Sequence, residues 1–176
     1  MKRASTNGFT LIELLSVSGL VATVGLITSA TFLNIMKGVV KSETIKEVKQ
    51  NGDYAISTIE RLMRNAEGIT SACSGASTGS ITILDVDSNT TTFSCVVSDG
   101  IGKIASSSAS TNGFLTNNKV TLGNTCPGSL SFSCTRSANG VKSVTIQFSL
   151  SQALLEVPTS ERATEQFRTT VYLRNE

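Results

Sequence analysis

Four cysteines carry the most reactive side chains of this sequence, and their spacing separates metal binding from disulfide formation. Cys73, Cys95, Cys126 and Cys134 are separated by 21, 30 and 7 residues, and the chain contains no histidine. Zinc sites use closely paired ligands, which this spacing does not provide. The polar, basic residues 1–8, which run directly into a long apolar stretch, resemble an export signal. An even number of cysteines after such a signal is typical of disulfides formed in an oxidising compartment. We therefore predict two disulfides and no metal site.

The remaining polar residues offer no recognisable catalytic chemistry. Asp85, Asp87 and Asp99 could bind calcium, but their spacing does not fit an EF-hand loop, and turn or edge-strand carboxylates are the better interpretation. The sequon Asn89-Thr90-Thr91 is likewise interpreted as a turn. A phosphate-binding glycine loop is absent from the sequence, and no histidine is present to act as the general base of a serine or cysteine nucleophile. An exported enzyme is therefore disfavoured, and we predict no catalytic residues and no cofactor.

Glu13 is the residue whose position demands an explanation. No ionisable side chain occurs between Glu13 and Lys37. As a helix, Leu14 to Met36 would extend about 35 Å, enough to cross a hydrocarbon core of about 30 Å. A carboxylate inside such a span costs about 2.5–3.5 kcal/mol on insertion scales. Either a partner compensates the charge, or Glu13 reaches the membrane interface from the helix end.

The charges of the chain are balanced once the first residues are set aside. The sequence has 15 Lys and Arg against 13 Asp and Glu, and Lys2 and Arg3 precede Gly8. Without residues 1–8 the chain is neutral and has no basic stripe, which argues against nucleic-acid binding. Basic residues before the apolar span predict a cytoplasmic N-terminus, although Lys37 and Lys41 after it reduce the asymmetry.

An amphipathic helix is predicted directly after the apolar span. Apolar or small residues recur there at alternating steps of three and four, which is the period of a helix face. We expect one helix from near Phe9 to near Ala66, with a bend or break near Gly38 or Gly52 and a stop at Glu67-Gly68. The predicted buried stripe consists of Ile45, Val48, Gly52, Ala55, Ile59, Leu62 and Ala66.

From Ser80 onward the period changes to two, which predicts antiparallel strands. Asp87-Ser88-Asn89 and Asn139-Gly140 are turn sequences between such runs. Ser106 to Gly113 has little apolar surface and is predicted to be a loop. The expected class is α+β, with a long N-terminal helix packed on an antiparallel sheet. The predicted strands are Ile81–Val86, Thr91–Val97, Lys119–Leu122, Leu130–Thr135, Val141–Leu150 and Phe167–Leu173.

The residues Gly8-Phe9-Thr10-Leu11-Ile12-Glu13-Leu14, with a basic leader before them and an uncharged span after them, resemble the prepilin motif. The resemblance is to type IV pilins and the pseudopilins of type II secretion. It covers about the first thirty residues, and the rest of the chain agrees in architecture. Many pilus-forming members carry a proline in this helix, whereas the first proline here is Pro127.

The resemblance implies a processing site and an assembly residue. A prepilin peptidase would cut between Gly8 and Phe9, and the new amino group of Phe9 would be methylated. Glycine suits this cleavage site because it has no side chain to obstruct the enzyme. Glu13 would then pair with the amine of a neighbouring subunit, as in the family. Small residues at Ser18 and Ala22, and at Gly25 and Ser29, could permit close helix packing, or could be incidental.

For the disulfides, we expect the pairs Cys73–Cys95 and Cys126–Cys134, while two other pairings remain possible. The second pair would close a short loop loosely similar to those of many pilins. The first would join the end of the helix to the sheet.

The resemblance implies that the protein is a structural subunit of a type IV pilus or related filament. The missing helix proline favours a minor-pilin role. The alternatives are a pseudopilin of a secretion or competence system, and an uncleaved, membrane-anchored binding protein. The expected partners are prepilin peptidase, other pilin subunits, an assembly platform and, before assembly, membrane lipid. The subunit would be a single-pass cytoplasmic-membrane protein first and a surface or periplasmic filament component later. The predicted divisions are a leader (1–8), a transmembrane helix (9–36), an amphipathic extension (37–68) and a β-rich domain (69–176).

Overall fold

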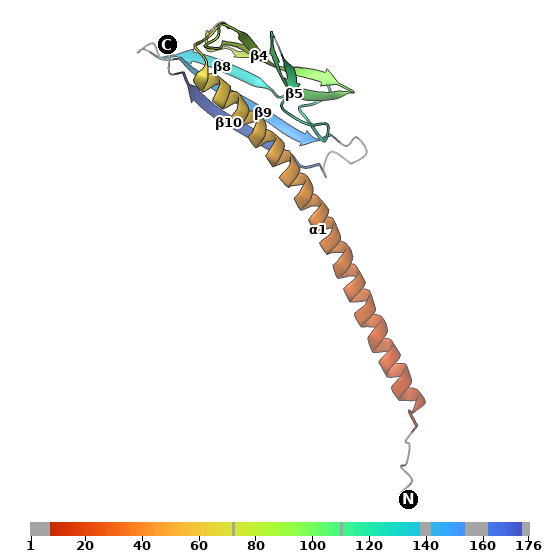
Figure 1. The fold of residues 1–176 in the computed structure, drawn as a ribbon. Coiled ribbons are helices and arrows are strands. Elements are labelled where there is room, and N and C mark those ends of the chain that lie inside the picture. Colours follow the sequence, from red (N-terminus) through yellow and green to blue (C-terminus); the bar gives the residue numbers. More distant parts are fainter. Residues whose placement is uncertain (1–7, 72, 110, 138–141, 154–161, 174–176) are drawn as a thin grey trace, which may run out of the picture. The chain divides into compact units, whose positions relative to one another are not determined.

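The computed structural model describes residues 8–71, 73–109, 111–137, 142–153 and 162–173. Within these residues, one long helix is followed by ten strands, all paired antiparallel, so the predicted α+β class is confirmed (Figure 1). By contacts the chain divides into two compact units, Met1–Ser42 and Glu43–Glu176.

The helix α1 extends from Leu11 to Asn65 without interruption, through both Gly38 and Gly52. It begins where the carbonyl of Thr10 accepts hydrogen bonds from the amides of Glu13 and Leu14, each at 3.2 Å. It ends close to the predicted position. Gly68 does not form the expected helix cap but begins a strand, and the amide of Glu67 already donates to the carbonyl of Leu84 at 2.8 Å.

The strands form two sheets within the second unit (Figure 1). Sheet A has the order β1 (Gly68–Ile69), β3 (Ser80–Leu84), β4 (Thr90–Ser98), β5 (Ile101–Ser108) and β6 (Asn112–Phe114). Sheet B has the order β10 (Thr164–Tyr172), β9 (Lys142–Gln152), β8 (Ser131–Arg136) and β2 (Ser77–Thr78), and β7 (Val120–Thr121) also pairs with β9.

Each of the six predicted strand segments overlaps an observed strand, but the predicted loop over Ser106–Gly113 is wrong. Strand β5 continues to Ser108 and β6 begins at Asn112. The serines are ordered by the ladder to β4, in which Ser106 lies opposite Phe93, so main-chain pairing replaces the apolar burial that they cannot supply. The turn at Asp87-Ser88-Asn89 is confirmed, and Ser88 has a φ of 58°. The turn predicted at Asn139-Gly140 lies outside the described residues.

The predicted stripe of α1 packs into the core of the second unit. Leu62, which was predicted to belong to the stripe, is only half-buried. Val48, Ala55 and Ile59 are at most 1% exposed as predicted, and so is Met63, which the predicted stripe did not include. Their spacing of seven, four and four keeps them on one face of the helix. Removing a Val, Ile or Met side chain from water contributes about 1.5–3 kcal/mol, so this face alone anchors residues 43–65 to the sheets.

Gly52 lies on the same face, and β10 is its neighbour. A Cβ at this position would overlap the ring of Phe167. That ring stacks on Phe148 of β9, with centroids 5.2 Å apart. The glycine that weakens the helix locally is therefore what allows an aromatic pair to approach the helix backbone.

Polar contacts fix the register of the helix on the sheets. The Lys119 ammonium lies 2.9 Å from the Glu47 carboxylate, and the amide of Asn117 donates to the side chain of Asn51 at 3.0 Å. The hydroxyl of Thr169 on β10 donates to the Glu60 carboxylate. These contacts flank the apolar stripe.

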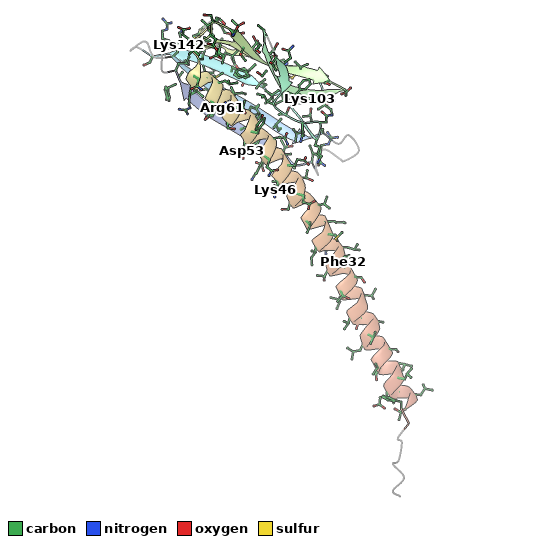
Figure 2. The ribbon with its side chains drawn as sticks, in the orientation of Figure 1. Phe32, Lys46, Asp53, Arg61, Lys103 and Lys142 are labelled. Carbon is green, nitrogen blue, oxygen red and sulfur yellow. A yellow bond between two sulfur atoms is a disulfide. The ribbon has the colours of Figure 1, made fainter. Side chains whose placement is uncertain are left out.

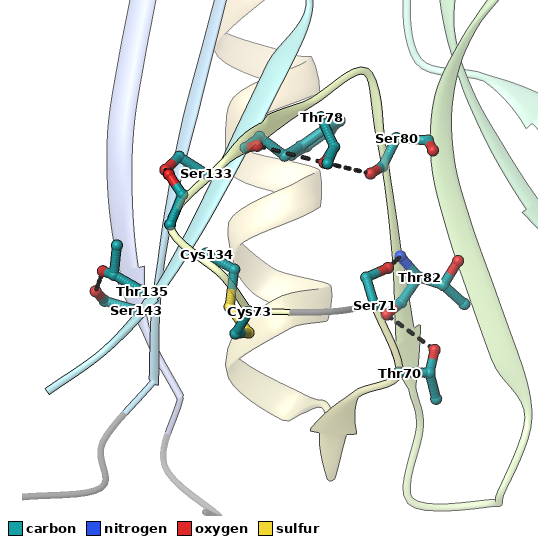
Figure 3. The surroundings of a disulfide bond; sticks show 12 residues. Thr70, Ser71, Cys73, Thr78, Ser80, Thr82, Ser133, Cys134, Thr135 and Ser143 are labelled. Carbon is teal, nitrogen blue, oxygen red and sulfur yellow. Dashed lines mark hydrogen bonds between the residues drawn. A yellow bond between two sulfur atoms is a disulfide. The ribbon is translucent and has the colours of Figure 1, made fainter.

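The expected disulfide pairing is wrong. The structure joins Cys73 to Cys134, with Cα atoms 4.7 Å apart (Figure 3). It joins Cys95 to Cys126, with Cα atoms 5.4 Å apart. An extended strand advances about 3.3 Å per residue, so β8 carries Cys134 away from Cys126 and toward the segment after β1.

The Cys95–Cys126 bridge therefore connects sheet A to the loop between two strands of sheet B, and the Cys73–Cys134 bridge joins β8 of sheet B to the segment between β1 and β2. Cys95 belongs to β4 of sheet A, and Cys126 precedes β8 of sheet B. Cys73 follows β1 of sheet A, and Cys134 lies in β8. In the chain-entropy account, loops of this size contribute about 3–5 kcal/mol each.

Candidate functional site

The candidate site is the apolar helix segment, defined here as Phe9 to Met36 of the first unit. Its side chains project from the helix, Phe32 among them (Figure 2). Phe9 is 80% exposed and Leu11 is 83% exposed. Among the described residues, α1 is the one helix long and apolar enough to cross a membrane. So much exposed apolar surface requires lipid or other protein to cover it.

Glu13 lies in the first turn of α1 and is exposed. The hydroxyl of Thr10 donates to its Oε2 at 3.4 Å, and the Glu13 amide donates to the Thr10 carbonyl at 3.2 Å. The unsatisfied amides at a helix N-terminus also favour a carboxylate there. Thr10 was not among the predicted site residues, although the Thr-x-x-Glu spacing is a known signal for a helix start.

Five hydroxyl groups within the segment donate hydrogen bonds to the helix itself. The side chains of Ser16, Ser18, Thr23 and Thr28 donate to carbonyls three or four residues earlier, at 2.8 to 3.0 Å. Thr31 does the same at 2.9 Å. A hydroxyl bonded in this way avoids most of the cost of entering an apolar environment. The polar residues of the span are thus compatible with lipid or with a helix bundle.

The helix brings several predicted site residues onto one surface. Phe9, Glu13 and Val17 follow at intervals of four residues, and together with Ser18 and Ala22 they line a shallow groove. A second groove along the helix includes Gly25, beside which a Cβ would meet no atom within 4 Å. The small residues thus lie on open helix surface, where a second helix could approach closely.

The peptide bond between Gly8 and Phe9 is accessible. Both residues are exposed, they precede the first residue of α1, and no atom lies within 4 Å of a Cβ built on Gly8. The bond therefore lies in non-helical chain, where a peptidase can bind the backbone. The leader residues 1–7 lie outside the described residues.

The acidic residues of the β domain make local contacts typical of turns. Asp85 accepts a hydrogen bond from the amide of Val86 at 2.8 Å, and Asp99 accepts one from the hydroxyl of Ser98 at 3.1 Å. Within the described part of the chain, no group of three His, Cys, Asp or Glu residues is placed to hold a metal ion.

Comparisons of the chain with protein-family models, with curated proteins and with solved structures gave no match. The fold and the geometry of the apolar helix segment are therefore the basis for a functional conclusion.

Proposed function

We propose that this protein is a membrane-anchored filament subunit of the type IV pilin kind, processed between Gly8 and Phe9. The observation that carries the proposal is the apolar helix segment itself. It is exposed along its length, it follows an accessible Gly-Phe bond, and its single ionisable side chain is Glu13 in the first helical turn.

A membrane anchor alone does not explain Glu13, because any uncharged residue would insert more easily. A filament does explain it. Cleavage after Gly8 creates a positive amine on Phe9, and a helix bundle built from many copies would bury both charges. Pairing Glu13 with the amine of a neighbouring copy leaves neither charge uncompensated in an apolar core.

The second unit fits the role of a domain carried outside the membrane. Its two disulfides require an oxidising compartment to form and persist. The core of this unit lies within residues 48–173 and includes the buried face of α1. We therefore expect the unit to stay folded without the apolar helix segment. We favour a minor-pilin role, with a pseudopilin of a secretion or competence system as the nearest alternative in the same class.

Intact-mass spectrometry of the membrane-extracted chain tests this proposal. In cells with prepilin peptidase, we expect a species lacking residues 1–8 and carrying one added methyl group on Phe9. Cells without the peptidase are the control and should keep the full chain. An uncleaved chain in both strains would contradict the proposal and would identify an anchored binding protein instead.

A further inference from the structure

The outer face of sheet B is built almost entirely from neutral polar side chains. Side chains alternate along a strand, so odd positions of β8 (131–135) and β9 (143–151) share one face with even positions of β10 (164–172). All of these residues are exposed or half-exposed. Nine are serine or threonine, two are glutamine, and the others are Arg168 and Tyr172. We call this surface the hydroxyl face.

Hydrogen bonds between strands hold many of these hydroxyls in pairs. Two paired hydroxyls share one hydrogen, so each pair keeps a second donor and free lone pairs for a partner. The side chains are short, and their ordering in the sheet has already removed much of the entropy that binding would otherwise cost. The Thr135–Ser143 pair is visible in Figure 3. The pairs are Thr135–Ser143 at 2.9 Å, Thr145–Thr170 at 3.0 Å and Ser151–Thr164 at 3.0 Å.

Folding does not require this composition. Any polar side chain can occupy the solvent side of a sheet, and serine is not among the residues enriched in strands. In the whole sequence 16% of the residues are charged, whereas Arg168 is the one charged residue of the hydroxyl face. The surface thus lacks the usual charges and has hydrogen-bonding groups in their place.

The chemistry of the face limits its partner. An apolar partner would strip water from hydroxyls without replacing their hydrogen bonds, at about 1–3 kcal/mol for each group left unpaired. A highly charged partner would meet only one charged side chain on this face, that of Arg168, so most of its charges would have no complementary group. A neutral chain rich in hydroxyls both donates and accepts hydrogen bonds and brings no charge to desolvate.

We infer that the hydroxyl face binds a neutral polysaccharide. The amides of Gln147 and Gln166 add donors and acceptors beside the hydroxyl pairs. Tyr172, which is 64% exposed at one end of the face, offers an aromatic ring for the apolar side of a sugar. The β9 members of the hydroxyl pairs are Ser143, Thr145 and Ser151. At about 3.3 Å per residue they lie roughly 7 and 20 Å apart along the strand, so a polymer can contact several pairs at once and combine weak contacts into one attachment.

The experiment measures binding of the full-length chain, held in lipid nanodiscs, to immobilised dextran, amylose and a β-1,3-glucan, with heparin as the charged comparison. We expect binding to at least one neutral glucan. The double variant Thr145→Val/Thr170→Val removes one hydroxyl pair and keeps the branched shape, and it should weaken this binding at least fivefold.

The matched control is Thr82→Val/Thr92→Val, which removes a hydroxyl pair of the same kind, at 2.9 Å, from sheet A. It should leave glucan binding unchanged. Gln166→Glu provides a second variant, because it adds a negative charge to the face without removing a paired hydroxyl, and it should also weaken binding.

Three results would overturn the inference. One is no binding to any of the three glucans. Another is equal weakening by the sheet A and sheet B variants. The third is binding to heparin alone that is lost in Arg168→Gln. Cleavage and filament assembly do not enter these measurements, so failure here leaves the proposed function standing.

Discussion

Gly52→Ala tests the packing of α1 on β10, and two opposing effects set its outcome. Alanine is favoured over glycine inside a helix by about 1 kcal/mol. The added methyl group would overlap the Phe167 ring, and that ring cannot retreat freely because it stacks on Phe148, which is 1% exposed. Overpacking a core in this way typically costs about 1–3 kcal/mol. We expect a net loss of about 1 kcal/mol.

For a domain of this size, that loss corresponds to a fall in Tm of about 4 °C. Thermal unfolding followed by circular dichroism of the detergent-solubilised chain measures it. Gly38→Ala is the control, since no atom lies within 4 Å of a Cβ at that position, and its Tm should not fall. Combining Gly52→Ala with Phe167→Leu should cost less than the sum of the single changes. A Gly52→Ala variant as stable as the parent would refute this account of the contact.

The other predictions concern the cross-links, the domain and the processing site. Non-reducing peptide mapping should recover the Cys73–Cys134 and Cys95–Cys126 cross-links and no others. A peptide joining Cys126 to Cys134 would contradict this pairing. A fragment beginning at Lys41 should fold as a monomer, because it keeps the buried face of α1 and lacks the apolar helix segment. Filaments of this fragment in a sedimentation experiment would contradict the assignment of assembly to the apolar helix segment. Gly8→Leu should leave the precursor uncut in membranes, whereas a processed product on immunoblots would argue against this cleavage site.

Periodicity was enough to predict the helix and most of the strands. Val48, Ala55 and Ile59 repeat at helical spacing, and Val144, Ile146 and Phe148 alternate as in a strand with one buried face. All of β5 (Ile101–Ser108) was missed, as were the short strands β1, β2 and β6. The order of β5 comes from pairing with β4, and its sequence, with Gly102, Lys103 and three serines, carries no clean apolar alternation.

Contacts between distant residues could not be predicted. The correct disulfide partners depend on how β8 runs past the segment after β1, which spacing between cysteines does not encode. Gly52 was interpreted as a weak point of the helix, because the sequence does not indicate that Phe167 would lie against it. The contact between Thr10 and Glu13 could have been predicted, because a threonine three residues before a glutamate is a known signal for a helix start.

Glu13→Gln tests the central claim most directly, because the change keeps the size of the side chain and removes the charge proposed to meet the Phe9 amine. The measurement is the amount of cleaved subunit in membranes against the amount in sheared filaments. Cleavage and membrane level should be normal. The filament share should fall at least about tenfold, since breaking a buried ion pair on one side costs about 3–5 kcal/mol. A normal filament share with normal cleavage would contradict the pairing of Glu13 with a neighbouring subunit.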